Sequence, residues 1–481
     1  MVVIGGGLAG ITAALDCADA GARVTLVEVR RRLGGAAYSF EREGLMMDNG
    51  QHVFLRCCVS YRALLARLGS EDRVTIQPRL EIPVLKPGAR PAALRRSALP
   101  APLHLSGALV RYPHLSLRER PRAARAALAL ARLDPSEEAL DRVTFGDWLA
   151  RHGQSANAVR NLWDLIALPS LNLPAAEASL ALAAFVFRTG LLSGSDCGDI
   201  GFHSATLDEV IGEPAARALS SAGVELMLGS RAERLRLLDG GFEVQGPQAH
   251  PSAEVAIVAV PPARAATLLE PLIGAGAQGM LALGSSPIVN LHVLYDRPVC
   301  QLAFAAGVGT PVQYLFDRTA AAGAPAGSQY LAISLSGAER EMQMNVEALR
   351  REYIPALARL LPRARHAQVE LFVATREHAA TFRAAPGSRA LRPGPRTSLP
   401  GLLLAGAWTA TGWPATLEGA VLSGHAAAGE ALRTLALQPS SAPVRTASAG
   451  EARSPGETRN AAQVAPAAEA TMARRASASG P

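Results

Sequence analysis

A glycine-rich turn near the start of the chain is the feature that most restricts its fold. Gly5, Gly7 and Gly10 follow a short apolar segment, residues 2–4, and precede a segment whose apolar residues recur at helical spacing. A second apolar segment ends at Glu28, which is placed to accept hydrogen bonds from ribose hydroxyls. This order predicts strand, turn, helix and strand, the βαβ unit of dinucleotide-binding folds.

Each residue of this turn has a physical task in such a fold. Gly5 allows the tight turn, Gly7 lets the backbone approach a pyrophosphate, and Gly10 lets the helix pack on the strand. Residues 5–10, which include Leu8 and Ala9, are the turn, and the phosphates would lie at the N-terminus of the helix that follows, where free N–H groups and the helix dipole favour negative charge. The alternative is a glycine turn with a purely structural role.

Two further glycines follow the second predicted strand. Gly34 and Gly35 permit close backbone approach, and the neighbouring Arg32 can meet a phosphate. A glycine pair alone is more often only a turn. Behind a dinucleotide-binding unit, it favours FAD over NAD.

The last predicted strand and helix enclose another candidate site. Residues 402–406 have the pattern of a buried strand, and residues 415–435 that of a helix. Pro414 suits the start of that helix. Its first N–H groups would point at the pyrimidine edge of a flavin, where the reduced ring holds negative charge.

Together these segments resemble the amine oxidase and phytoene desaturase superfamily of flavoproteins. Its opening motifs match residues 5–10, Glu28 and residues 32–35, and its last FAD-contacting motif matches residues 406–420. From the resemblance we expect FAD contacts in this last motif at four residues: Gly406, Trp408, Thr416 and Leu417.

The superfamily also has a segment beside the flavin ring that residues 48–52 resemble, which places Gly50 at the cofactor. His52 is either a hydrogen-bonded structural histidine or a residue near the reacting centre.

Parts of residues 406–420, together with residues 50–52 and 169–179, are similar to hydroxysqualene dehydroxylases, the flavoproteins of hopanoid synthesis. The chain departs from the superfamily pattern at three positions. Ala36 replaces a second arginine, and Ala407 and Ala410 replace acidic residues. Backbone groups would therefore have to hold this part of the cofactor.

The resemblance implies FAD as cofactor and a long isoprenoid hydrocarbon as substrate. The implied reaction is reductive dehydroxylation of hydroxysqualene to squalene by hydride transfer from reduced flavin, with NAD(P)H as electron donor, directly or through a reductase. The alternatives are a carotenoid or phytoene-type polyisoprenoid desaturase and an inactive flavin-fold partner of a prenyl synthase, supported only by Ala407 and Ala410. An amine oxidase is disfavoured because Lys86 is the only lysine. The sequence identifies no catalytic residue and no metal site.

The expected fold is α/β: an FAD-binding, Rossmann-like three-layer domain of the two-dinucleotide-binding-motif type with an inserted α+β substrate domain. The FAD domain is expected in residues 1–75, 195–260 and 395–437, and the substrate domain in residues 76–194 and 261–394. Residues 78–133 are expected to be helices and loops. An apolar substrate tunnel could come from residues 99–133 and 180–186. Residues 438–481 have almost no large apolar side chains and are predicted to be a disordered tail.

The charge of +7 comes almost entirely from arginine. No arginine-rich run is interleaved with aromatic residues, so nucleic acid is not an expected partner. Residues 95–132 combine arginine and leucine, which indicates either a solvated face or a peripheral contact with anionic lipid. The five cysteines form no CxxC pair, which suits a reducing cytoplasm. The apolar run 178–186 is too short to span a bilayer. We therefore expect a cytoplasmic protein, with the inner face of the cell membrane as its peripheral site.

Overall fold

The computed structural model of the chain describes residues 1–248 and 250–436. The predicted disordered tail, residues 438–481, lies outside the described residues.

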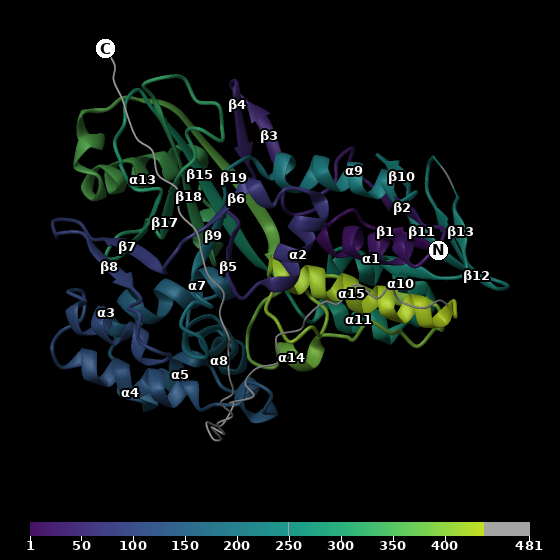
Figure 1. The fold of residues 1–481 in the computed structure, drawn as a ribbon, viewed down its shortest axis with the longest axis horizontal. Coiled ribbons are helices and arrows are strands. Elements are labelled where there is room, and N and C mark those ends of the chain that lie inside the picture. Colours follow the sequence, from purple (N-terminus) through teal and green to yellow (C-terminus); the bar gives the residue numbers. More distant parts are fainter. Residues whose placement is uncertain (249, 437–481) are drawn as a thin grey trace, which may run out of the picture. The chain divides into compact units, whose positions relative to one another are not determined.

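A five-stranded parallel sheet is assembled from distant parts of the sequence (Figure 1). Its order is β10 (Glu225–Leu228), β2 (Thr25–Glu28), β1 (Val2–Ile4), β14 (Ala256–Val258) and β20 (Leu402–Leu404). The strands β1, β2 and β20 were expected from their apolar patterns. Because all five run parallel, their carboxyl ends meet at one edge, where ligands bind in open α/β sheets.

Alternate residues of these strands face two different layers. Val3 and Ile257 pack with helices, whereas Val2 and Val258 belong to the cluster that contains Phe242. The helical layer comprises α1 (Leu8–Asp19), α2 (Val59–Leu68), α9 (Glu213–Ser221) and α15 (Leu417–Thr434). The opposite layer comprises β11 (Arg234–Leu238), β12 (Gly241–Gln245), β13 (Ser252–Ala253) and α10 (Pro262–Ile273). The expected three-layer α/β arrangement is present.

A seven-stranded sheet makes up much of the remaining chain. Its order is β19 (Val369–Thr381), β15 (Ser286–Tyr295), β18 (Gln329–Ser336), β17 (Tyr314–Asp317), β16 (Phe304–Gly307), β7 (Glu81–Leu85) and β8 (Ala92–Arg95). The helix α13 (Val346–Leu360) packs on this sheet.

The expectation of helices and loops over residues 78–133 is wrong at its start, where β7 and β8 form. Pro83 lies inside β7 and cannot donate to the ladder, which hides the strand from a sequence pattern. The later part is helical, with α3 (Ser106–Arg111) and α4 (Glu119–Ala131).

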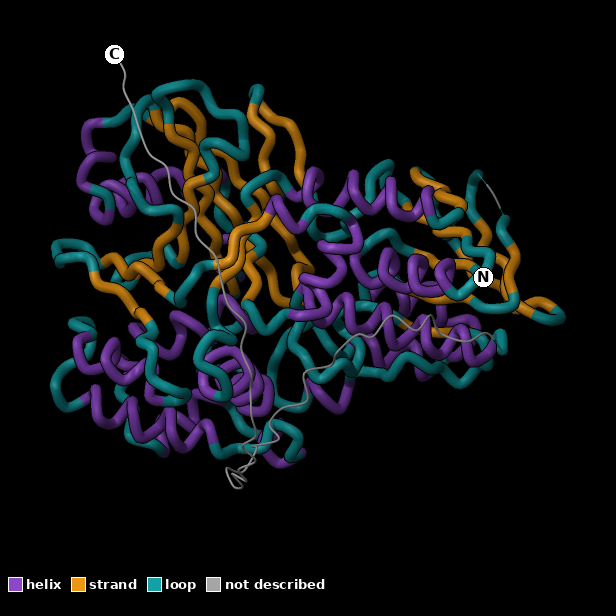
Figure 2. The backbone as a smooth tube through the Cα atoms, in the orientation of Figure 1, coloured by secondary structure: helices purple, strands orange, loops and turns teal. Residues whose placement is uncertain are grey.

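More helices gather below the seven-stranded sheet in the view of Figure 2. They are α5 (Phe145–Arg151), α6 (Ala156–Ala158), α7 (Asp164–Leu171) and α8 (Leu180–Phe187). Trp148 and Trp163 are buried among them, as expected. The apolar run 178–186 becomes α8 and packs in the core. In the described part of the chain, no helix is long and apolar enough to cross a membrane.

Short elements join these regions. Strands β3 (Ser39–Arg42) and β4 (Leu45–Asp48) form a hairpin, and β5 (Val53–Leu55), β9 (Ile200–His203) and β6 (Val74–Ile76) form a small sheet. The remaining helices are α11 (Ala275–Leu281), α12 (Glu339–Met342) and α14 (Ser388–Leu391). The strands of the parallel sheet fall within residues 1–75, 195–260 and 395–437, and we keep the two-domain division as a proposal.

Candidate flavin site

Two glycines of the first turn are required by backbone contacts. Gly5 has φ +114°, and a Cβ there would lie 2.4 Å from the Ala259 carbonyl oxygen. A Cβ at Gly10 would lie 1.9 Å from the Gly5 oxygen. No other residue fits at these two positions without moving the backbone of the turn.

Gly7 is different, because the space beside it is open. A Cβ there would meet only the Gly35 Cα, at 3.7 Å. The first turn of α1 has no acidic residue and Gly7 has no side chain to cap it, so the N–H groups of Leu8, Ala9 and Gly10 have no acceptor among the described residues. An uncapped helix start with an open approach is the environment that a pyrophosphate requires.

Glu28 is held by the turn itself. Its carboxylate oxygens accept hydrogen bonds from the backbone N–H groups of Gly6, at 2.6 Å, and Arg30, at 2.7 Å. Each oxygen keeps a second lone pair, so the carboxylate can also accept from a hydroxyl. Its role at ribose stays a prediction.

Arg32, Gly34 and Gly35 lie against the same turn. The Gly34 N–H donates to the Gly6 oxygen at 2.9 Å, and Gly7 pairs with Gly34 in an isolated bridge. The Arg32 guanidinium lies 3.6 Å from the centre of the Tyr38 ring, and burial lowers its pKa. This stacking holds a cation beside the uncapped helix start.

A second helix start lies at α15. Thr416, and not Pro414, is its N-cap, and the Thr416 hydroxyl accepts from the Gly419 N–H at 3.1 Å. The start expected near residue 415 is therefore two residues too early, because the threonine cap sets the boundary. Among the described residues, nothing accepts from the N–H groups of Leu417 and Glu418.

The neighbouring acid Glu418 has another task. Its carboxylate accepts from the backbone N–H groups of Ser60, at 3.0 Å, and Tyr61, at 2.7 Å, at the start of α2. Burial raises the pKa of Glu418. This side chain therefore ties α2 to α15 and leaves the α15 backbone donors free.

The starts of α1 and α15 face the same edge of the sheet but are offset from each other along the helix axis. Figure 1 shows α15 beside α1, and a Cβ at Gly424 would lie 2.5 Å from the Ala9 oxygen. Leu417 precedes Gly424 by two helical turns, or roughly 10 Å at 1.5 Å per residue. One elongated dinucleotide can therefore place its phosphates at α1 and its ring at α15.

The segment between these regions and the second sheet is anchored from several strands. The Asn49 amide donates to the Ala36 oxygen and to Glu377 Oε1, both at 2.9 Å, and Asn290 Nδ2 donates to the Asn49 oxygen at 2.9 Å. Asn290 Oδ1 is buried without a partner among the described residues and would lie 3.6 Å from a Cβ at Gly50. A free buried acceptor beside Gly50 fits a donor on a bound ligand.

Asn290 and Glu377 were not foreseen from the sequence. They lie in ordinary strand patterns, and only the packing of β15 and β19 against residues 48–52 gives them this place.

Gly406 and Trp408 lie where β20 ends. The Gly406 N–H donates to Ser423 Oγ at 2.8 Å, and the buried Trp408 indole donates to the Val260 oxygen at 3.0 Å, beyond the end of β14. The structure places both at the carboxyl edge of the sheet. Trp408 holds two strand ends together, and its contact with FAD stays a prediction.

Arg392, which the sequence did not suggest, holds the segment in which Ala407 replaces an acidic residue. The buried guanidinium of Arg392 donates to the carbonyl oxygens of Ala407, at 3.2 Å, Trp408, at 3.3 Å, and Thr409. Burial lowers the pKa of Arg392 to about 10. The segment is therefore held through its backbone, without a carboxylate.

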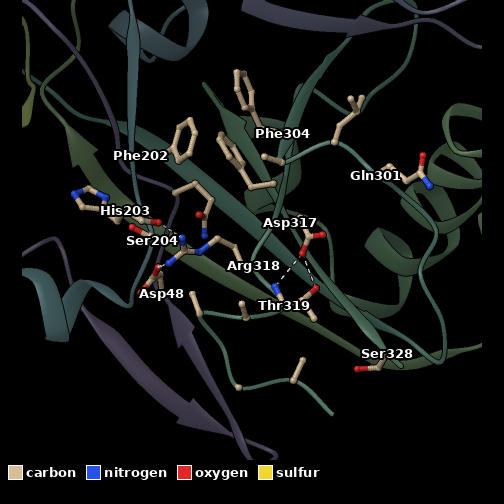
Figure 3. Close-up of a pocket in the computed structure, with 18 of the residues that line it drawn as sticks. Asp48, Phe202, His203, Ser204, Gln301, Phe304, Asp317, Arg318, Thr319 and Ser328 are labelled. Carbon is tan, nitrogen blue, oxygen red and sulfur yellow. Dashed lines mark hydrogen bonds and ion pairs between the residues drawn. The ribbon is translucent and has the colours of Figure 1, made fainter. Parts of the chain in front are cut away.

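A cavity of about 610 Å³ adjoins Gln51 and His52 (Figure 3). Its apolar wall includes Phe202, Phe304 and Phe316. Figure 3 shows the charged pair of Asp48 and Arg318 away from the rings of Phe202 and Phe304. The Arg318 guanidinium lies 2.9 Å from the Asp48 carboxylate and donates to the Ala205 oxygen at 2.7 Å. The positive charge of Arg318 is therefore paired with Asp48 within the protein.

A second cavity of about 230 Å³ shares Phe202 and residues 302–304 with the first. Residues 99–133 and 180–186, suggested by the sequence for an apolar tunnel, line neither of these two cavities. The leucines of α8 pack in the hydrophobic core and so do not line a cavity.

His52 borders the larger cavity and is half-buried. Its Nδ1 lies 3.1 Å from the Gly50 oxygen, and burial lowers its pKa below the ordinary value. The imidazole is therefore neutral at pH 7, with its proton on Nδ1 toward the carbonyl. His203 behind it is buried, and its pKa is lowered to about 3.

Known proteins share this fold and its motifs. The pattern of the family described as flavin containing amine oxidoreductase matches residues 8–432. Hydroxysqualene dehydroxylases from Rhodopseudomonas palustris and Sinorhizobium fredii are each 30% identical over 85% of this chain and 92% of their own length. A zeta-carotene desaturase from Zea mays is 31% identical over 34% of this chain and 30% of its own.

Solved structures agree on the fold. Cyclohexylamine oxidase from Brevibacterium oxydans superimposes with a TM-score of 0.67 at 19% identity. Putrescine oxidase bound to putrescine gives 0.67 at 18% identity, over 90% of this chain and 98% of its own. The uncapped start of α1 and the free N–H groups of Leu417 and Glu418 at the start of α15 fit FAD, which is the cofactor of this chain. The chain belongs to the flavin-containing amine oxidoreductase family, is similar to its hydroxysqualene dehydroxylases, and is an FAD-dependent oxidoreductase.

Proposed function

We propose that this enzyme converts hydroxysqualene to squalene by replacing the allylic hydroxyl with hydrogen. The observation that carries this proposal is the extent of the similarity. The dehydroxylases match along 92% of their length, whereas the zeta-carotene desaturase of Zea mays matches along 30%. The apolar wall of the larger cavity suits a hydrocarbon substrate.

In this proposal the residues predicted from the sequence hold the cofactor in two parts. Leu8, Ala9 and Gly10 bind the pyrophosphate through their N–H groups, with Gly7 giving access. Glu28 binds ribose, and Arg32, Gly34 and Gly35 lie beside the phosphates. When bound, reduced FAD would supply both the hydride and a proton, so that the hydroxyl leaves as water and the flavin becomes oxidised. The start of α15 at Leu417 favours the negative charge of the reduced ring.

The cavity residues bind and orient the substrate. The aromatic wall holds the isoprenoid chain and excludes water from the reacting carbon. His52 does not protonate the leaving hydroxyl in this scheme. Its lowered pKa keeps it neutral, and the one proton of the neutral ring faces the Gly50 oxygen. Its role is to shape the cavity wall next to Gly50.

The second candidate, a polyisoprenoid desaturase, is favoured by the match to zeta-carotene desaturase over 175 residues. The reading as an inactive partner is weakened by Arg392, which holds the segment of Ala407 without acidic side chains. Amine oxidation is disfavoured because Lys86, the only lysine, is exposed beside Gly309 at the end of β7.

The proposed electron donor and cellular location follow from the proposed substrate. NAD(P)H, directly or through a reductase, is the proposed electron donor. The proposed location is the cytoplasm, with peripheral contact at the inner face of the cell membrane. All five cysteines are free thiols, which suits a reducing compartment.

The test is an anaerobic assay of FAD-loaded protein with hydroxysqualene and either dithionite or NAD(P)H, with products identified by mass spectrometry. Squalene formed only with reduced flavin supports the proposal. Matched reactions contain oxidised FAD, or phytoene with a quinone acceptor. No squalene from a yellow protein that dehydrogenates phytoene would establish the desaturase instead. No turnover from a protein that binds no FAD would favour the inactive partner.

A further inference from the structure

The basic residues of this chain are concentrated in one short stretch. Residues 82–133 contain ten of the 48 basic residues and one of the 41 acidic residues, Glu119. The other parts of the chain hold 38 basic and 40 acidic residues and are close to neutral. The positive charge is therefore a local property of residues 82–133.

The one acid in this stretch is turned inward. The Glu119 carboxylate accepts from the Ser116 N–H at 2.7 Å and from Asn157 Nδ2 at 3.1 Å, and it also binds the Ser155 hydroxyl. These bonds lower its pKa to about 2. These bonds tie Glu119 to Ser116, Ser155 and Asn157, and among the described residues no carboxylate forms an ion pair with Arg122, Arg125 or Arg132.

The arginines of α4 form a row. Arg118, Arg122, Arg125 and Arg132 recur at spacings of three, four and seven, so they project from one side of the helix. All four are exposed, whereas Ala123, Ala126 and Leu130 face the core. Leu117 and Leu128 lie on the side next to this row and are 77% and 42% exposed.

The preceding segment extends the same surface. Leu99, Leu103 and Val110 are 49%, 54% and 64% exposed, and α3 packs against α4. Arg120 joins the two helices by donating to the Val110 oxygen at 2.6 Å. We call the exposed arginine, leucine and valine side chains of residues 99–132 the arginine–leucine surface. They comprise Leu99, Leu103, Val110, Arg111, Leu117, Arg118, Arg122, Arg125, Leu128 and Arg132.

This surface lies next to the smaller cavity. Arg95, the last residue of β8, lines that cavity, and β8 contacts α3. The smaller cavity shares Phe202 with the larger one that reaches His52. The helix α3, which carries Val110 and Arg111 of this surface, therefore packs against the strand that borders the smaller cavity.

We propose that the arginine–leucine surface docks on an anionic lipid bilayer. Arginines in a row attract anionic headgroups, and exposed leucines beside them enter the interface, as in helices that lie on membranes. An aqueous protein face does not require five large apolar side chains to be exposed here. The idea that an apolar substrate then enters through the smaller cavity rests on the proposed function, but the docking itself does not.

The test measures binding of the full FAD-loaded chain to vesicles without any substrate. Vesicles of phosphatidylcholine alone are compared with vesicles that also contain phosphatidylglycerol, at low and at physiological ionic strength. We expect binding to the anionic vesicles only, weakened by salt. Equal binding to both vesicles, or binding to neither, overturns the proposal.

Matched variants locate the surface. The triple variant Arg122→Gln, Arg125→Gln and Arg132→Gln should bind anionic vesicles roughly 100-fold more weakly. A control triple variant, Arg351→Gln, Arg359→Gln and Arg363→Gln, removes the same charge from exposed positions on and after α13 and should bind normally. If the control loses as much affinity, net charge alone explains the binding and the surface is wrong.

The apolar part of the surface has its own control. The double variant Leu117→Ser and Leu128→Ser should weaken binding by at least roughly 10-fold. Leu281→Ser on α11, where the leucine is 55% exposed, should not. Retained affinity for poly-glutamate with no vesicle binding would indicate an acidic protein partner and overturn the proposal.

Vesicle binding and turnover can fail separately. A chain that binds anionic vesicles but forms no squalene leaves the docking surface intact and removes the proposed function. A chain that forms squalene from detergent-dispersed substrate but never binds vesicles removes the docking surface alone.

Discussion

A methyl group at Gly7 provides a sharp test of where the cofactor lies. Gly7 has φ −79° and ψ 176°, which alanine adopts without strain. The new Cβ would meet only the Gly35 Cα at 3.7 Å, an ordinary contact. Gly7→Ala should therefore fold normally, and reduced freedom of the unfolded chain should raise the free energy of unfolding by about 0.4–1 kcal/mol.

The same methyl group projects into the space that a pyrophosphate needs. If it displaces the phosphates from one or two N–H donors of α1, each lost hydrogen bond to a charged group costs about 1.5–3 kcal/mol. The Kd for FAD should therefore rise by roughly 10-fold for one weak bond to roughly 25,000-fold for two strong ones. Fluorescence titration of the apoprotein with FAD measures this, and chemical denaturation of the apoprotein measures stability.

Gly10→Ala is the contrasting variant. Its Cβ would lie 1.9 Å from the Gly5 oxygen, so it should destabilise the apoprotein itself. If Gly7→Ala binds FAD as tightly as the unchanged chain, the phosphates do not lie at this turn and the assignment of Leu8, Ala9 and Gly10 fails.

Three further expectations follow from single buried contacts. Arg392→Met should lower the free energy of unfolding, measured by urea titration, by about 2–4 kcal/mol, because three carbonyl oxygens lose their donor. The control variant Arg396→Met removes an exposed ion pair and should change the free energy of unfolding by under about 1 kcal/mol. Thr416→Ala should cost about 1 kcal/mol and Thr416→Ser much less, since the hydroxyl caps α15; equal losses in thermal denaturation would contradict the capping role. The folded-state pKa of His203 is about 3 against 6.5, so the chain loses stability as the pH falls below 6.5. From pH 7 to 5, the loss should be smaller in His203→Gln by about 2 kcal/mol, and an unchanged pH dependence in urea titrations would show that His203 is not buried as a neutral ring.

The glycine turn and several strands could be predicted from the sequence because they depend on residues close together in the chain. The contacts that demand Gly10 arise within one turn of chain, from Gly5. The clash at Gly5 comes from Ala259, yet its positive φ already calls for glycine. The strands β1, β2 and β20 were likewise evident, since buried parallel strands are short continuous apolar runs.

Other elements depended on distant partners and could not be foreseen. The strand β7 contains Pro83 and pairs with β16, more than two hundred residues later. The start of α15 was expected near residue 415, and the bond between the Thr416 hydroxyl and the Gly419 N–H sets it at Leu417.

The sequence by itself determined the parallel-sheet fold, the glycine turn and the FAD family, because turn geometry and apolar periodicity act over a few residues. Only the tertiary structure decided how far apart the two helix starts lie, since that offset is set by the packing of Gly424 against Ala9. It also decided that Arg392 holds the backbone of Ala407 and that Asn290 presents a free oxygen beside Gly50. These contacts join strands and loops far apart in the chain, and no local pattern encodes which of many similar side chains will meet.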